Sequence, residues 1–163
     1  MAMSKLATRP QQASAPYEAD LYLWTIEQAR LLRERRFAEL DLPNLIDEVQ
    51  SVGASEKREI RSRLSVLLAQ LLKWKYQPGA RPSGWLGTIN EQRSRLMLLF
   101  EDSPSLRRHP AEVFDTCYLS ARLKAAKETG IDFTLFPETA PFTVEQALDD
   151  GFLPQAPDPS DRS

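Results

Sequence analysis

The sequence predicts an all-α fold: an up-down four-helix bundle with a kinked or broken second helix and a short C-terminal helix in an irregular arm. Apolar residues recur at spacings of three and four along most of the chain, and no segment alternates apolar and polar residues for long. Short connections between helices of similar length favour antiparallel neighbours. With 163 residues and 42% hydrophobic composition, the chain can bury the core of one domain.

The ends of the chain differ in composition from its middle. Residues 1–16 have no long apolar stretch, and residues 156–163 are rich in Pro, Asp and Ser, so both are expected to be flexible tails. A single helical domain is expected over 17–155, with a helical core over 17–130 and an arm over 131–155. Because the sequence shows neither a secretory signal nor an apolar run of membrane-spanning length, we expect a cytoplasmic protein with no membrane partner.

The first two helices are expected at about 18–36 and 42–77. The first has an apolar stripe that includes Trp24, and Asp41 is the expected N-cap of the second. Gly53 weakens a helix interior, and Ser55 can cap a restart. A kink or break there is favoured over a straight helix, and it would divide the segment into 42–52 and 55–77.

Breaks and caps then define the later elements. Ser83 is expected to cap a third helix over 84–101, Gly130 to end a fourth that follows Pro104, and Thr143 with Gln146 to form a capping box for the short helix. The expected inward-facing residues are Ile60, Leu64, Leu67, Leu68, Leu71 and Leu72 on the second helix, Leu86, Ile89, Leu96, Met97 and Phe100 on the third, and Val113, Cys117, Ala121 and Ala125 on the fourth.

Familiar catalytic sites lack their residues in this sequence. One His and one Cys exclude a disulfide framework and a Cys/His zinc site, and six Gly form no phosphate-binding loop. Cys117 is expected to be a small core residue and His109 a surface or helix-end residue. The helical carboxylates have no Glu-x-x-His pair, which a di-iron bundle requires. We therefore expect no catalytic, cofactor-binding or metal-binding residues and no cofactor, although carboxylate chemistry is not excluded.

Charge is distributed unevenly along the chain. The formal net charge is −2, yet residues 57–95 carry nine basic and two acidic residues, and residues 131–163 carry seven acidic residues and one Arg. One interpretation is a basic surface for a nucleic acid or an acidic protein, shielded by the acidic arm. The other, which is favoured, is that the bases coat solvated helix faces while the arm packs across them.

Aromatic and basic residues are expected to meet at one end of the bundle. The candidate interaction surface there comprises Trp24, Lys73, Trp74, Tyr76, Arg81, Trp85 and Arg93. Such a group can bind cations, bases or acidic peptides. It can also serve as a hydrophobic plug whose polar tips stay wet, and this second reading is favoured.

Several separated motifs resemble one bacterial family. They are the run from YEADLYLW to LLKWKYQP, the stretches TINEQRSRL and EDSPSL, and the closing FPETAPFTVEQALDDGF. Together they resemble the domain-of-unknown-function family twenty-nine over Tyr17 to Pro154. The resemblance implies a bacterial, all-helical protein without an established activity. Members often have His where Gln70 stands and Cys where Ala140 stands, which lowers the expectation of an enzyme further.

Two functional hypotheses follow. The first is a protein-interaction module that uses exposed helix faces or the aromatic–basic group, with a protein partner or self-association. The alternative is a small nucleic-acid-associated protein that uses the basic segment 57–95, with the acidic arm as a competitor.

Overall fold

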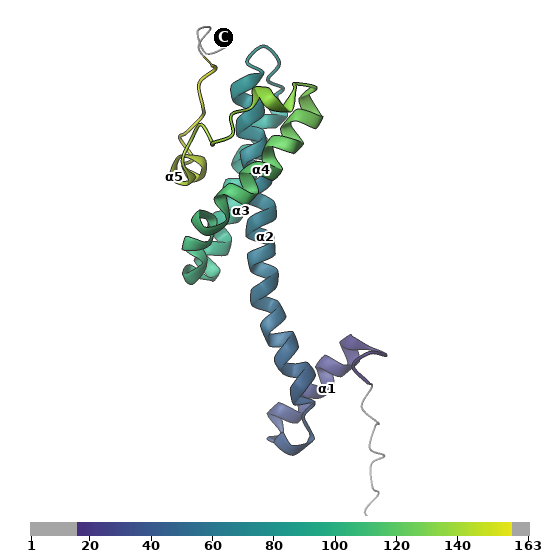
Figure 1. Cartoon of the computed structure of the whole chain (residues 1–163). Coiled ribbons are helices and arrows are strands. Elements are labelled where there is room, and N and C mark those ends of the chain that lie inside the picture. The colour runs from purple at the N-terminus through teal and green to yellow at the C-terminus, as the bar shows by residue number, and fades with distance from the viewer. Residues whose placement is uncertain (1–15, 158–163) are drawn as a thin grey trace, which may run out of the picture. The chain divides into compact units, whose positions relative to one another are not determined.

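Every regular element in the described part of the chain is helical. The computed structural model describes residues 16–157, so both predicted tails lie almost wholly outside it. The all-α prediction is confirmed. In chain order the elements are α1 (Leu21–Arg33), η1 (Phe37–Glu39), α2 (Leu42–Tyr76), α3 (Ser83–Asp102), η2 (Pro104–Arg108), α4 (His109–Thr129), η3 (Phe133–Leu135) and α5 (Val144–Leu148) (Figure 1).

The chain divides into two compact units. The N-terminal unit ends at Val52, and the C-terminal unit begins at Gly53. The up-down four-helix bundle is not confirmed, because α1 belongs to one unit whereas α3 and α4 belong to the other. The assignment of 17–155 as a single domain stays a prediction.

The predicted break at Gly53 is wrong, and the alternative of a kink there stays a prediction. One α-helix, α2, runs from Leu42 to Tyr76, and Ser55 lies inside it. A glycine in a helix interior costs about 1 kcal/mol relative to Ala. A break would instead leave two further helix ends, each with unpaired backbone groups that need caps or water. The smaller penalty prevails, and the backbone of Gly53 stays helical.

Polar hydrogen bonds that converge on Asp41 organise the N-terminal unit. The Asp41 carboxylate accepts from the Trp24 indole N–H at 3.1 Å and from the Asn44 amide at 2.7 Å, while the Asp41 backbone N–H donates to the Gln28 side chain at 2.9 Å. The hydrogen bond from the Asn44 side chain is the largest of the effects that lower the pKa of Asp41, and the Asn44 backbone N–H donates as well, as expected of a cap. Trp24 and Gln28 are both buried.

The helix α1 is shorter than predicted. Asp20 caps it by accepting from the Leu23 N–H at 2.9 Å, so the helix begins at Leu21 instead of near residue 18. It ends at Arg33, and Arg35 has a φ of 58°, which a continuing right-handed helix does not permit.

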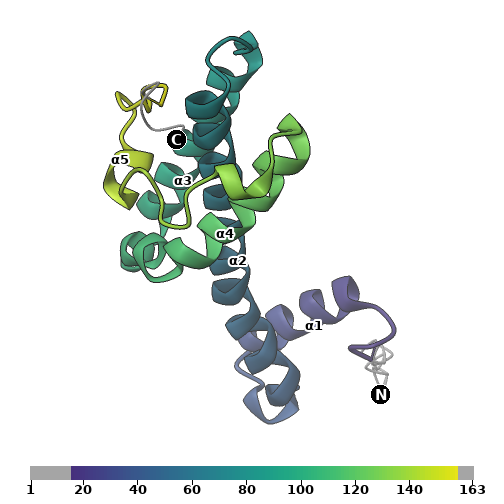
Figure 2. The ribbon, with the colours of Figure 1, turned by 45° about the horizontal axis from the view of Figure 1, so that its top comes forward.

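The core of the C-terminal unit surrounds α2. The chain turns back after α2 so that α3 lies beside it, and α4 crosses the pair (Figures 1 and 2). All six residues predicted to face inward on α2 are buried. On α3, Leu86 and Met97 are exposed by 39% and 38%, so these two predictions are wrong. The buried apolar residues from the rest of the unit are Ile89, Leu96 and Phe100 on α3, Cys117, Tyr118, Ala121 and Ala125 on α4, and Phe136, Phe142 and Ala147 on the arm.

Arginine side chains attach the arm to the helices through its backbone. Arg93, only 1% exposed, donates to the carbonyls of Ala147 at 2.9 Å, Phe152 at 2.8 Å and Asp150 at 3.4 Å. Arg122 donates to the Phe136 carbonyl at 2.8 Å. The arm therefore packs on the helices, as the favoured interpretation of the charges expects, but these bonds use carbonyl oxygens and not its acidic side chains.

Of the three capping signals predicted after α2, two are confirmed. Gly130 follows α4 with a φ of 72°, the left-handed conformation that favours glycine. Thr143 and Gln146 form the predicted capping box of α5. Ser83 does not cap α3: it is the first helical residue, and Pro82 precedes it without a side-chain hydrogen bond.

Replacing Gly53 with Ala tests whether α2 is continuous. No atom lies within 4 Å of the Cβ that Ala would add, and the backbone there is helical, so we expect the free energy of unfolding to rise by about 0.5–1 kcal/mol. Chemical denaturation measures this change. A loss of stability would show that Gly53 adopts a conformation that Ala cannot.

Replacing Arg93 with Met tests the attachment of the arm. The change leaves the carbonyls of Ala147 and Phe152 without their donor, so we expect a loss of about 2–4 kcal/mol in unfolding free energy and faster proteolysis within residues 131–155. Arg95→Met is the matched control, because Arg95 lies on the same helix and is exposed. Equal effects of the two changes would contradict a special role for Arg93.

Candidate interaction surfaces

Five of the seven predicted interaction residues meet where α2 turns into α3. The Lys73 ammonium is buried there, and its Nζ lies 2.7 Å from Glu128 Oε2 and 4.8 Å from the centre of the Trp85 ring. The hydrogen bond from Lys73 lowers the pKa of Glu128. The Lys73 ammonium is therefore engaged by partners within the chain.

Other members of this group also make contacts within the chain. Arg81 donates from Nε to the Trp74 carbonyl at 2.9 Å, and its guanidinium lies 4.6 Å from the centre of the Trp74 ring. Tyr76 contacts Phe136 edge-on with ring centres 5.2 Å apart. These contacts are those of a plug that closes the end of the helices, and binding by the group stays a prediction.

The remaining two predicted residues lie elsewhere. Trp24 belongs to the N-terminal unit, where its ring meets Tyr17 edge-on at 5.0 Å. Arg93 is inside the C-terminal unit, where it holds the arm. The prediction that they join the group depended on a four-helix bundle that brings the starts of the first and third helices to one end, and that bundle is not confirmed.

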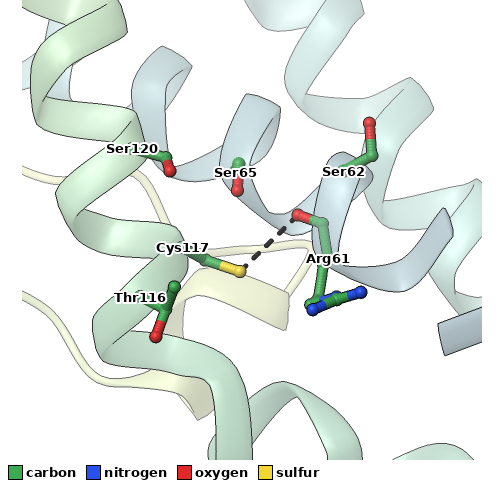
Figure 3. A pocket seen from close by; sticks show the side chains of 6 residues that line it. All are labelled: Arg61, Ser62, Ser65, Thr116, Cys117 and Ser120. Atoms are coloured by element: carbon green, nitrogen blue, oxygen red, sulfur yellow. Dashed lines mark hydrogen bonds between the residues drawn. The ribbon is translucent and has the colours of Figure 1, made fainter. Parts of the chain in front are cut away.

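A shallow pocket of about 180 Å³ lies between α2 and α4. Figure 3 shows Cys117 and Ser120 on α4 facing Ser65 and Arg61 on α2. The Cys117 thiol donates to the Arg61 carbonyl at 3.6 Å, and burial raises the pKa of this thiol. A protonated thiol is a poor nucleophile. Cys117 is thus the small core residue that the sequence predicts.

Elsewhere in the described residues, neither a metal site nor a membrane span is found. No group of three or more His, Cys, Asp or Glu side chains within residues 16–157 is arranged to hold a metal ion. His109 is the first residue of α4, a helix end as predicted, but it is buried, with Nδ1 3.0 Å from Glu112 Oε2. No helix in the same range is both long and apolar enough to cross a bilayer.

Most bases of the segment 57–95 have partners within the chain. Arg63 pairs with Glu59 and Lys75 donates to the Gln155 carbonyl, in addition to the contacts of Lys73, Arg81 and Arg93. The four exposed bases for which the described residues provide no hydrogen bond or ion pair are Lys57, Arg58, Arg61 and Arg95. Two of the nine bases, Arg63 and Lys73, are neutralised by carboxylates, and the others that have partners donate to neutral carbonyls.

The largest exposed apolar surface lies on the N-terminal unit, and the sequence interpretation did not single it out. Of sixteen exposed large apolar side chains among the described residues, ten lie between residues 21 and 52. On α1 and η1 they are Leu21, Tyr22, Leu23, Ile26, Leu32 and Phe37, and on α2 they are Leu42, Ile46, Val49 and Val52.

The helix α1 exposes large apolar side chains on its outer face in addition to those it buries on its inner face. Its inner face buries Trp24 and Leu31, yet Tyr22 and Ile26 on the opposite face are exposed by 73% and 48%. The outer face of an amphipathic surface helix consists mostly of charged and polar residues, so exposed side chains such as Tyr22 and Ile26 depart from that pattern. The signal was present in the run LYLWTIEQARLL, where the apolar residues exceed what one stripe needs.

A row of apolar side chains extends along the first turns of α2. Leu42, Ile46 and Val49 follow each other at spacings of four and three, which places them on one face of the helix. All three are more than half exposed. This outer row and the outer face of α1 are the apolar surface of the N-terminal unit.

Replacing Glu128 with Gln tests the role of Lys73. The variant leaves the buried ammonium without its counter-ion, and because Glu128 is 37% exposed we expect a loss of only about 1–3 kcal/mol at pH 7. In a Lys73→Met background the same change should cost less than about 0.5 kcal/mol, as a double-mutant cycle shows for a direct contact. Glu138→Gln, at an exposed position without an ion pair, is the control.

The same pair gives a pH dependence. Because the folded state lowers the pKa of Glu128, its stabilising contribution is present above the unfolded value near about 4.3 and is lost as the pH falls through the lowered folded value. The difference in unfolding free energy between the wild type and Glu128→Gln should therefore shrink below about pH 4. A difference that stays constant into acid would contradict the ion pair.

Comparison with known proteins identifies the family. A family model described as Domain of unknown function DUF29 matches residues 16–153, most of the chain. Searches among curated proteins and among solved structures give no match. The chain therefore belongs to the family Domain of unknown function DUF29, as its sequence motifs predicted.

Proposed function

We propose that this protein is a non-catalytic interaction module that binds another protein through the apolar surface of its N-terminal unit. The observation that supports the proposal is the apolar outer face of α1, with Tyr22 and Ile26 in solvent. An exposed apolar patch of this kind typically marks an interface. The proposal includes the cytoplasmic location that the sequence predicts.

The sequence segments on either side of the described residues contain few large apolar side chains that could cover this surface. Residues 1–15 contain only Met1, Met3 and Leu6 as large apolar residues, and residues 158–163 contain none. Covering ten exposed apolar side chains takes a comparable number of apolar partners. The partner is therefore expected to be another folded protein surface and not either of these two segments.

Charge favours a protein over a nucleic acid or an anionic membrane. Residues 16–52 contain eight acids and four arginines, a net charge of −4. Phosphate backbones and anionic lipids are repelled by such a surface. In the C-terminal unit, the cations of the basic segment are mostly engaged within the chain, so no observation there favours the nucleic-acid alternative.

Charged substitutions in the apolar surface test the proposal. Ile26→Asp and Ile46→Asp are expected to weaken partner binding at least about tenfold, since burying an unpaired carboxylate at an interface is costly. The controls are Leu119→Asp and Leu123→Asp, which alter equally exposed leucines on α4 in the other unit. Circular dichroism checks that each variant folds.

Binding is measured in two stages. Tagged wild type and variants are used to capture proteins from nuclease-treated bacterial lysate, with capture quantified by mass spectrometry. Each candidate is then purified and titrated against the wild type, both interface variants and both controls. A protein, including a second copy of this chain, that binds in a way dependent on Ile26 or Ile46 supports the proposal. Binding that is equal for all variants, or that requires nucleic acid, contradicts it.

A further inference from the structure

The residues on and beside the outer face of α1 are arranged so that two copies of the helix complement each other when they run antiparallel. We propose that a second copy of this chain is the partner that covers α1, through an antiparallel α1–α1 contact around a two-fold axis. This inference rests on the proposed function and names the partner. Two-fold contacts bring the same surface of both copies together, so the surface must complement itself.

Unpaired charges of opposite sign lie in the turn before α1 and at the last residue of α1. Glu18 precedes the helix and Arg33 is its last residue, both are exposed, and the described residues provide an ion pair to neither. In contrast, Arg30 pairs with Glu27 and Glu34. The acid is thus near one end and the base at the other, and both are available to a partner.

Antiparallel pairing brings these opposite charges together twice. When Glu18 of one copy faces Arg33 of the other, the two-fold symmetry makes the same contact at the opposite end. In that register Tyr22 faces Ala29, a large side chain against a small one, and Ile26 lies beside its counterpart near the axis. Large and small residues that alternate across a seam interdigitate well.

A parallel arrangement lacks this complementarity. It would place Glu18 beside Glu18 and Arg33 beside Arg33, and like charges in contact are unfavourable. Antiparallel helices also place the positive end of one helix dipole beside the negative end of the other. Each N-terminal unit carries a net charge of −4, so long-range repulsion between two copies opposes the contact, and the two Glu18–Arg33 pairs have to offset it.

Charge exchange between Glu18 and Arg33 tests the pairing. We measure dimer dissociation of the full chain by sedimentation equilibrium between about 1 μM and 1 mM, a range suited to small interfaces. Glu18→Arg and Arg33→Glu should each weaken the dimer about tenfold, since each change places like charges at both ends. The double variant should return to within about threefold of the wild type. Lys127→Glu, an exposed base of the C-terminal unit, is the control.

Each outcome separates this inference from the proposed function. Rescue in the double variant supports the antiparallel contact. The inference is overturned if the wild-type chain stays monomeric over the whole concentration range. It is also overturned if the double variant dimerises as weakly as the single variants, or if neither single change alters the dissociation constant. If a different protein still binds through Ile26 or Ile46 in those cases, the proposed function stands without self-association. If no binding depends on either residue, both fail.

Discussion

The burial of α2 on every side is the constraint on which the rest of the C-terminal unit depends. Seven consecutive residues, from Leu67 to Lys73, are all buried, so two turns of this helix have no solvent-facing side. One neighbouring helix covers only one face of another. Burying all faces therefore requires α3, α4 and the arm together, which explains why the largely irregular arm packs on the helices.

Complete burial also dictates where the polar groups go. Lys73 lies in the buried run and is satisfied by Glu128, whereas Gln70 keeps a side-chain oxygen without a hydrogen-bond partner among the described residues. Arg93 and Arg122 supply long donors that reach the backbone of the arm. An irregular segment has carbonyls that no helix or sheet satisfies, and buried ones need such donors. The acidic side chains of the arm accept none of these hydrogen bonds, although the charges of Asp150 and Asp149 partly offset the lowering of the Arg93 pKa by burial.

The sequence predicted what depends on local chemistry and failed where distant contacts decide. The inward face of α2, the left-handed Gly130 and the Thr143 capping box follow from spacing and residue type, and each is confirmed. Gly53 was misread because its low helix propensity suggests a break. The cost of the two helix ends that a break would create cannot be read from one residue.

The candidate site was harder to predict than the helices. Lys73, Trp74 and Arg81 do gather at one turn, since they are close in sequence. The sequence prediction grouped Arg93 with the wrong residues, because its partners lie more than 50 residues away along the chain. These partners are backbone carbonyls, which every residue has, so no side chain in the sequence marks them. Trp24 was misplaced because the bundle topology was assumed and not read from residues.

The N-terminal unit reverses the usual distribution of polar and apolar groups. Its few interior contacts are largely polar, with Asp41 joining Trp24, Gln28 and Asn44, while most of its large apolar side chains face outward. Polar bonds give a small hairpin a defined geometry but contribute only about 0.5–1.5 kcal/mol each. Its apolar groups would add the larger share of stability only when covered. A unit built in this way is expected to gain stability when a partner covers its apolar groups, which is what the proposed function requires.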